Sequence, residues 1–181
     1  MRQRLHAAGF QPEFAGRMLD RRFDRSGEFA GADEVVRVRS YHGTDGWTSE
    51  VLGWKGATTV NADGYKARPE LESSLAGGAP AAALLARLHF EVVHAIDRHV
   101  EVYRVADAMV RLEWYPECDT LMEVEGDGVA IEAAIAATGI ARNEFTAEPL
   151  AAFAARYQAR LGRPARLALL TPDEHPAHWP R

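Results

Sequence analysis

The chain has little cysteine, no long apolar run and no excess of positive charge, and each lack excludes a class of protein. Its single cysteine, Cys118, rules out an internal disulfide and favours a reducing, cytoplasmic setting. The longest apolar run, residues 79–86, is broken by Pro80 and is too short to cross a bilayer. A net charge of −5 argues against wrapping of nucleic acid. We therefore expect a cytoplasmic protein with neither a nucleic-acid nor a membrane partner.

Hydrophobic periodicity indicates one α+β domain whose middle part is rich in strands. Alternating or extended segments predict strands at 14–24, 33–41, 47–55, 65–75, 108–115 and 120–125, and one long strand or a hairpin at 90–105. Helical spacing predicts helices at 1–8, 129–138 and 148–161, each followed by a glycine that can cap it, and at 80–89 after Pro80. The pair Gly77-Gly78 is expected to end the strand before that last helix. The tail, 171–181, is expected to be irregular.

Four of the predicted strands gather charged residues on one face. These sets are Arg37 with Arg39, Arg68 with Glu70 and Glu72, Arg111 with Glu113, and Glu123 with Glu125. Any one set is compatible with a solvated outer face, because charged strand faces usually meet water. The opposite faces are apolar enough to pack against helices, through Val36, Val38, Leu71, Val110, Leu112, Met122 and Val124. An antiparallel β-barrel with charge inside and helices packed outside accounts for both faces.

The paired charges have a clear chemistry if they line such a lumen. Two Glu side chains two residues apart, such as Glu123 and Glu125, stay ionised together when a cation bridges them. Their hard oxygen donors suit Mg²⁺ or Mn²⁺. The Arg37-x-Arg39 pair offers planar donor forks for phosphate, and Lys55 adds a point charge. No glycine-rich phosphate loop occurs, so side chains must hold any phosphate.

Seven short motifs containing these residues follow one another in a familiar order. They are Leu19-Asp20-Arg21-Arg22-Phe23-Asp24, Val36-Arg37-Val38-Arg39, Trp54-Lys55-Gly56, Arg68-Pro69-Glu70-Leu71-Glu72, the stretch from Arg98 to Tyr103, Arg111-Leu112-Glu113 and Met122-Glu123-Val124-Glu125-Gly126. Over roughly residues 1 to 160, this order resembles the CYTH superfamily, the triphosphate tunnel metalloenzymes. The Trp-Lys-Gly element looks most like the class IV adenylate cyclase-like branch.

The resemblance implies a role for each charged set. The implied triphosphate contacts are Arg37, Arg39, Lys55, Arg68, Arg98 and Arg111, of which Lys55, Arg68 and Arg111 are implied to be catalytic. The implied ligands of Mg²⁺ or Mn²⁺ are Glu123 and Glu125, with Glu70, Glu72 and Glu113 as further acidic groups. The substrate would be ATP, thiamine triphosphate or tripolyphosphate, converted to cyclic AMP or hydrolysed, and a homodimer is compatible with the family.

Two departures from the family pattern keep three interpretations open. The family begins with a Glu-x-Glu-x-Lys strand before its first helix, whereas this sequence opens on the helix. We therefore expect residues 1–170 to form a single CYTH-like domain that is incomplete at its N-terminus, followed by the tail, 171–181. Val100 stands where the family has a second basic residue after Arg98. The chain is then an enzyme (adenylate cyclase or triphosphatase), a non-catalytic nucleotide- or polyphosphate-binding module without the first catalytic strand, or an interaction domain with external charge.

Overall fold

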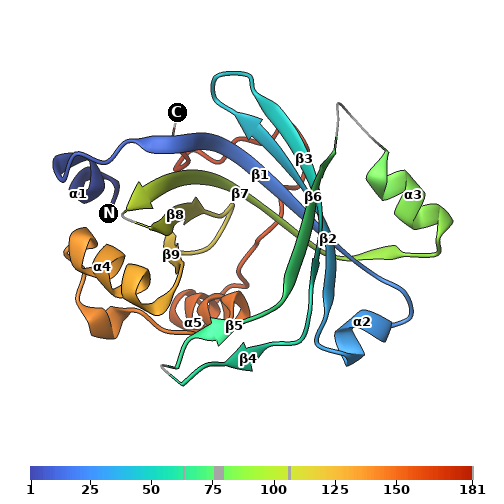
Figure 1. The fold of residues 1–181 in the computed structure, drawn as a ribbon. Helices are drawn as coiled ribbons and strands as arrows, with labels where there is room; N and C mark the ends of the chain where they lie inside the picture. Colours follow the sequence, from blue (N-terminus) through green and yellow to red (C-terminus); the bar gives the residue numbers. More distant parts are fainter. Residues whose placement is uncertain (63, 76–79, 106, 181) are drawn as a thin grey trace. The chain divides into compact units, whose positions relative to one another are not determined.

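The computed structural model describes residues 1–62, 64–75, 80–105 and 107–180, so the predicted strand end at Gly77-Gly78 lies outside the described residues. The described α-helices are α1 (Arg2–Ala7), α2 (Glu28–Gly31), α3 (Ala81–Arg87), α4 (Gly128–Thr138) and α5 (Leu150–Leu161), with a short 3₁₀ turn at Arg142–Glu144 (Figure 1). Within these ranges, no helix combines the length and the apolar character needed to cross a membrane.

Seven strands form one large sheet in the order β6-β3-β2-β1-β7-β8-β9 (Figure 1). Their bounds are β1 (Pro12–Asp24), β2 (Val35–Gly43), β3 (Thr48–Lys55), β6 (Glu70–Leu75), β7 (Glu91–Val105), β8 (Ala108–Trp114) and β9 (Leu121–Glu125). The pairs β2–β3, β3–β6, β7–β8 and β8–β9 are antiparallel, and β4 (Thr59–Val60) pairs separately with β5 (Lys66–Ala67). The predicted α+β class with a large antiparallel sheet is confirmed.

The chain divides into two compact units, and β1 and β7 contribute residues to both. The first unit contains residues 1–16 and 98–181, and the second contains residues 17–97. Each unit has its own cluster of buried apolar side chains.

In the first unit, one face of β7, β8 and β9 packs against α1 and α4. Leu5 of α1 and the small side chains Ala130 and Ala134 of α4 share a core with Val110 and Leu112 of β8. Met122 and Val124 of β9, which were also predicted to pack against helices, are partly buried against this core. The alternating pattern therefore predicted the apolar face of these strands correctly.

A side-chain cap fixes the start of α4. The carboxylate of Asp127 accepts a hydrogen bond from the backbone N–H of Ala130 at 2.8 Å, and Gly139 ends the helix in the left-handed conformation with φ 64°. We expect Asp127→Ala to lower the free energy of unfolding by about 1 kcal/mol, because the cap is lost. Urea unfolding followed by circular dichroism measures this, and Asp127→Asn, which keeps a capping oxygen, is the control. Equal losses for both variants would contradict the capping role.

The second unit packs α3 against the sheet face that carries Val36 and Val38. Val38, Phe23 and Leu85 of α3 are buried together. Leu71 lies opposite Trp54, which lies opposite Val36, so it shares this face as predicted, but its predicted packing against a helix is wrong, because the residue is 69% exposed. The single strand predicted at 65–75 is also interrupted: β5 pairs with β4, and β6 begins only after Pro69, which has no N–H to donate to a ladder.

Candidate functional site

The charged face of the second unit is built by three strands in register. Arg37 of β2 lies opposite Gly53 of β3, and Gly53 lies opposite Glu72 of β6. Because Gly53 has no side chain, Arg37 reaches across β3, and its Nη2 donates to Glu72 Oε1 at 2.9 Å. A Cβ at Gly53 would stand 3.5 Å from Arg37 Nε and 3.4 Å from Glu72 Oε1. Two residues further along β3, Lys55 lies opposite Glu70 and forms an ion pair with it.

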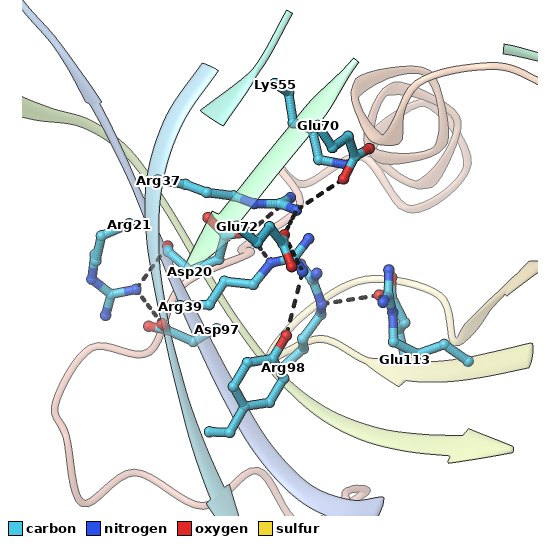
Figure 2. A network of polar contacts seen from close by, with 12 residues as sticks. Asp20, Arg21, Arg37, Arg39, Lys55, Glu70, Glu72, Asp97, Arg98 and Glu113 are labelled. Carbon is cyan, nitrogen blue, oxygen red and sulfur yellow. Dashed lines mark hydrogen bonds and ion pairs between the residues drawn. The ribbon is translucent and has the colours of Figure 1, made fainter. Parts of the chain in front are cut away.

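A buried carboxylate on β1 holds the two arginines of β2. Asp20 Oδ2 lies 3.4 Å from Arg39 Nε and 4.0 Å from Arg37 Nη1. All three residues are buried, with 1% of Asp20, 5% of Arg37 and 8% of Arg39 exposed. These charges are therefore buried rather than solvated, and phosphate contact by Arg37 and Arg39 stays a prediction. Figure 2 shows both guanidinium groups beside Glu72, with Asp20 on the same network.

Two buried atoms in this network lack a hydrogen-bond partner within the described part of the chain. They are Arg37 Nε, a donor, and Asp20 Oδ1, an acceptor. An unmade hydrogen bond of this kind costs about 1–3 kcal/mol. A bound oxyanion that accepts from Arg37 Nε would remove part of that cost.

Burial lowers the pKa of two cations of this cluster, Arg37 and Lys55, although both have carboxylate partners. Burial, followed by repulsion from Arg39, lowers the pKa of Arg37 despite its bond to Glu72. Burial and then repulsion from Arg37 likewise lower the pKa of Lys55, although Glu70 acts in the opposite direction. Both shifts mean that added negative charge would stabilise the charged forms.

The sequence prediction missed Asp20, for which no role was assigned. Its signal was available, because Asp20 falls in the inward phase of the predicted strand at 14–24, with Gly16 and Met18. A charged residue at an apolar phase needs a partner. Arg37 and Arg39 supply it, but only the pairing of distant strands reveals that.

In the first unit, one arginine binds three carboxylates. Arg111 of β8 lies opposite Glu123 of β9, and its Nη2 forms ion pairs with Glu123 and, at 3.2 Å, with Glu125 Oε1. Its Nε donates to Glu113 Oε1 at 2.8 Å. Burial opposes the charge of Arg111, but the carboxylates of Glu123, Glu113 and Glu125 outweigh it and raise the pKa well above its ordinary value.

The carboxylate of Glu113 is the most heavily engaged of this group. Besides Arg111, it pairs with Arg98 Nε at 3.0 Å and accepts a hydrogen bond from the hydroxyl of Tyr115. Figure 2 shows Arg98 and Glu113 facing one another. The Arg98 guanidinium also lies 5.8 Å from the centre of the Tyr115 ring. Burial and the negative charge of Glu113 raise the pKa of Tyr115, so the phenol stays protonated.

The oxygen donors of β9 are of the kind a hard divalent cation needs. Glu123 and Glu125 converge on one guanidinium nitrogen, so both can address a single positive charge. Their side chains are 48% and 43% exposed. No group of three or more His, Cys, Asp or Glu is arranged to hold a metal among the described residues. Metal binding by Glu123 and Glu125 therefore stays a prediction, in which water and phosphate oxygens complete the coordination, as is common for Mg²⁺.

The other predicted site residues have different contacts. Glu70 and Glu72, predicted as metal ligands, pair with Lys55 and Arg37. Arg68 lies before β6, and its guanidinium donates hydrogen bonds to two backbone carbonyl groups. Its Nε donates to the carbonyl of Gly56 at 2.5 Å, and its Nη2 donates to the carbonyl of Asp33. Triphosphate contact by Arg68 stays a prediction.

Comparisons with known proteins establish the fold. A protein from Pyrococcus horikoshii has a TM-score of 0.64 and 18% identity, over 82% of this chain and 88% of that one. A candidate adenylate cyclase from Vibrio parahaemolyticus has a TM-score of 0.66 and 11% identity, over 83% and 87%. A candidate adenylyl cyclase from Hippeastrum, with a dominant triphosphatase activity, has a TM-score of 0.59 and 19% identity, over 85% and 89%.

At these identities the likeness concerns the fold alone. No protein-family model matches the sequence, and no curated protein matches it. The chain has a CYTH-like fold, as the order of its motifs predicted.

Proposed function

We propose that the chain binds and processes a triphosphate-bearing compound with Mg²⁺ or Mn²⁺, in a tunnel formed by closure of its sheet. The observation that carries the proposal is the buried pair Arg37 and Arg39, held by Asp20, with Arg37 Nε lacking a partner within the described residues. Fixed guanidinium forks match phosphate oxygens. The CYTH-like fold supports the same conclusion, since two proteins that share it are named as candidate cyclases.

Within this proposal, the chain's own residues divide the work. Arg37, Arg39 and Lys55 bind and orient the phosphate oxygens, and Asp20 holds the two arginines in place. Glu123 and Glu125 would hold the divalent cation, which when bound supplies positive charge to the phosphates. Arg98, Arg111 and Arg68 are further candidates for phosphate contact. A ribose hydroxyl or a water molecule can attack phosphorus in such a site, giving cyclisation or hydrolysis.

One set of assays tests the proposal. The purified chain is incubated with tripolyphosphate, thiamine triphosphate or ATP, with Mg²⁺ or Mn²⁺, and the release of phosphate and the formation of cyclic AMP are measured. Metal-dependent turnover of any of these supports an enzyme. Metal-dependent binding by calorimetry without turnover identifies the non-catalytic binding module instead. The proposal fails if none of the three compounds binds.

The metal part of the proposal has its own test. We expect the double change Glu123→Gln, Glu125→Gln to weaken Mn²⁺ binding at least about tenfold, equivalent to about 1.4 kcal/mol, because both charged donors of β9 are removed. Electron paramagnetic resonance of free Mn²⁺ measures this without turnover. Glu148→Gln changes an exposed residue that precedes α5 and pairs with Arg156, and this control should leave binding unchanged. Undiminished Mn²⁺ binding in the double variant would remove β9 from the metal site.

A further inference from the structure

The two glutamates of β6 contact the cations that the proposed function assigns to phosphate. Glu72 Oε1 lies 2.9 Å from Arg37 Nη2 and 3.8 Å from Arg39 Nη1. Glu70 pairs with Lys55, and its Oε2 lies 3.8 Å from Arg37 Nη2. The two glutamate oxygens that accept hydrogen bonds, one from Arg37 and one from Lys55, therefore lie where a phosphate oxygen would accept the same bonds.

The exposure of these partners is unequal. The side chains of Glu70 and Glu72 are each 41% exposed, whereas those of Arg37, Arg39 and Lys55 are 6%, 10% and 20% exposed. Glutamate side chains on the solvent side can turn into water at low cost, because partly exposed ion pairs are weak. Asp20, whose side chain is 1% exposed, cannot. The cluster thus contains one fixed carboxylate and two displaceable ones.

The charge balance of the cluster follows from these contacts. Arg37, Arg39 and Lys55 contribute three positive charges, and Asp20, Glu70 and Glu72 contribute three negative charges, so the resting cluster is neutral. If both glutamates turn to solvent, two net positive charges remain. An anion therefore gains the full attraction of the cluster only by displacing both side chains.

We propose that Glu70 and Glu72 are resident anions that an incoming polyphosphate displaces, and that they exclude singly phosphorylated or carboxylate ligands from the site. This inference rests on the proposed function. A polyphosphate spans several cations at once and replaces both ion pairs together. Inorganic phosphate engages one or two cations and cannot compensate for the loss of both glutamates.

This role and the predicted role as metal ligands have opposite consequences. If Glu70 and Glu72 are metal ligands, their replacement by Gln should weaken the binding of polyphosphate that the metal supports. If they are resident anions, the same replacement should strengthen the binding of anions, even when a chelator has removed the metal. The unpartnered Nε of Arg37 favours the second role, because Glu72 satisfies only the Nη2 of that guanidinium.

Calorimetric titration in a chelator-containing buffer at constant ionic strength tests the inference. Inorganic phosphate and tripolyphosphate are titrated into the wild-type chain, Glu70→Gln, Glu72→Gln and the double variant. We expect the double variant to bind inorganic phosphate at least tenfold more tightly than the wild type, with a smaller gain for tripolyphosphate. The ratio of the affinity for tripolyphosphate to the affinity for inorganic phosphate therefore falls in the double variant, and each single variant should show a smaller fall.

Glu50→Gln is the matched control, because Glu50 lies on β3, opposite Ser40 in the register, and accepts a hydrogen bond from the Ser40 hydroxyl at 3.1 Å. It removes the same charge from the same sheet and should leave both affinities unchanged. If tripolyphosphate binds the wild type but the double variant does not gain affinity for inorganic phosphate, the inference is wrong and the proposed function stands. If neither anion binds any of these proteins, with or without Mn²⁺, the proposed function fails as well.

Discussion

Arg37→Ala is expected to weaken tripolyphosphate binding about 100-fold, equivalent to about 2.8 kcal/mol. The side chain of Arg37 is 6% exposed and is already held in place by Asp20 and Glu72, and its Nε lacks a hydrogen-bond partner among the described residues. Its loss removes charge-assisted hydrogen bonds that cost little to organise, and these are worth about 1.5–3 kcal/mol each. Isothermal titration of tripolyphosphate with Mn²⁺ present measures the change.

Two further variants sharpen this test. Arg37→Lys keeps the charge but loses the planar fork, so most of the loss should persist. Arg25→Ala removes an arginine of the same unit whose side chain is 47% exposed and pairs with Glu28, and it should leave the affinity unchanged. Wild-type affinity in Arg37→Ala would show that phosphate is bound elsewhere. The comparison requires that thermal unfolding first shows each variant to be folded.

Alternation along single strands predicted which residues share a face, and this part of the site was accessible from sequence. Arg37 and Arg39 lie on one side of β2, with Val36 and Val38 opposite, as the period of two requires. The glycine caps of α4 and α5 were equally local signals, since Gly139 and Gly162 both adopt the left-handed conformation.

The side-chain partners on neighbouring strands could not be predicted from the sequence in the same way. Glu72 meets Arg37 because β3 places a glycine between them, and this follows from the registers of two strand pairs. A strand's own sequence does not specify its register with a distant neighbour, so the metal role that the resemblance implied for the carboxylates of β6 did not include their pairing with Lys55 and Arg37. Asp20 was missed for the same reason.

Local interruptions explain the remaining errors. Arg68 was expected on the same strand face as Glu70 and Glu72, but Pro69 separates it from β6. Its guanidinium instead holds the carbonyls of Gly56 and Asp33. A proline within a predicted strand was the available warning, because it cannot donate to the ladder.

Arg111→Met is expected to lower the free energy of unfolding by about 3 kcal/mol, because it removes the one buried positive charge that Glu113, Glu123 and Glu125 share. The side chain of Arg111 is 7% exposed and that of Glu113 is 6% exposed. The loss falls at the lower end of the range for such changes, since Glu123 and Glu125 are 48% and 43% exposed and are stabilised by water. Urea unfolding at neutral pH measures the difference.

The physical cause can be separated from a general effect of losing an arginine. Arg104→Met removes an arginine whose side chain is 56% exposed and whose Nε lies 3.6 Å from Glu13 Oε1. This control should change the free energy of unfolding by less than about 0.5 kcal/mol. Adding Glu123→Gln to Arg111→Met should restore part of the lost stability, because it lowers the negative charge that Arg111 no longer balances, whereas Glu113 keeps Arg98 as its partner. Rescue by this second change assigns the loss to uncompensated charge. A double variant less stable than Arg111→Met would assign it instead to packing of the arginine side chain.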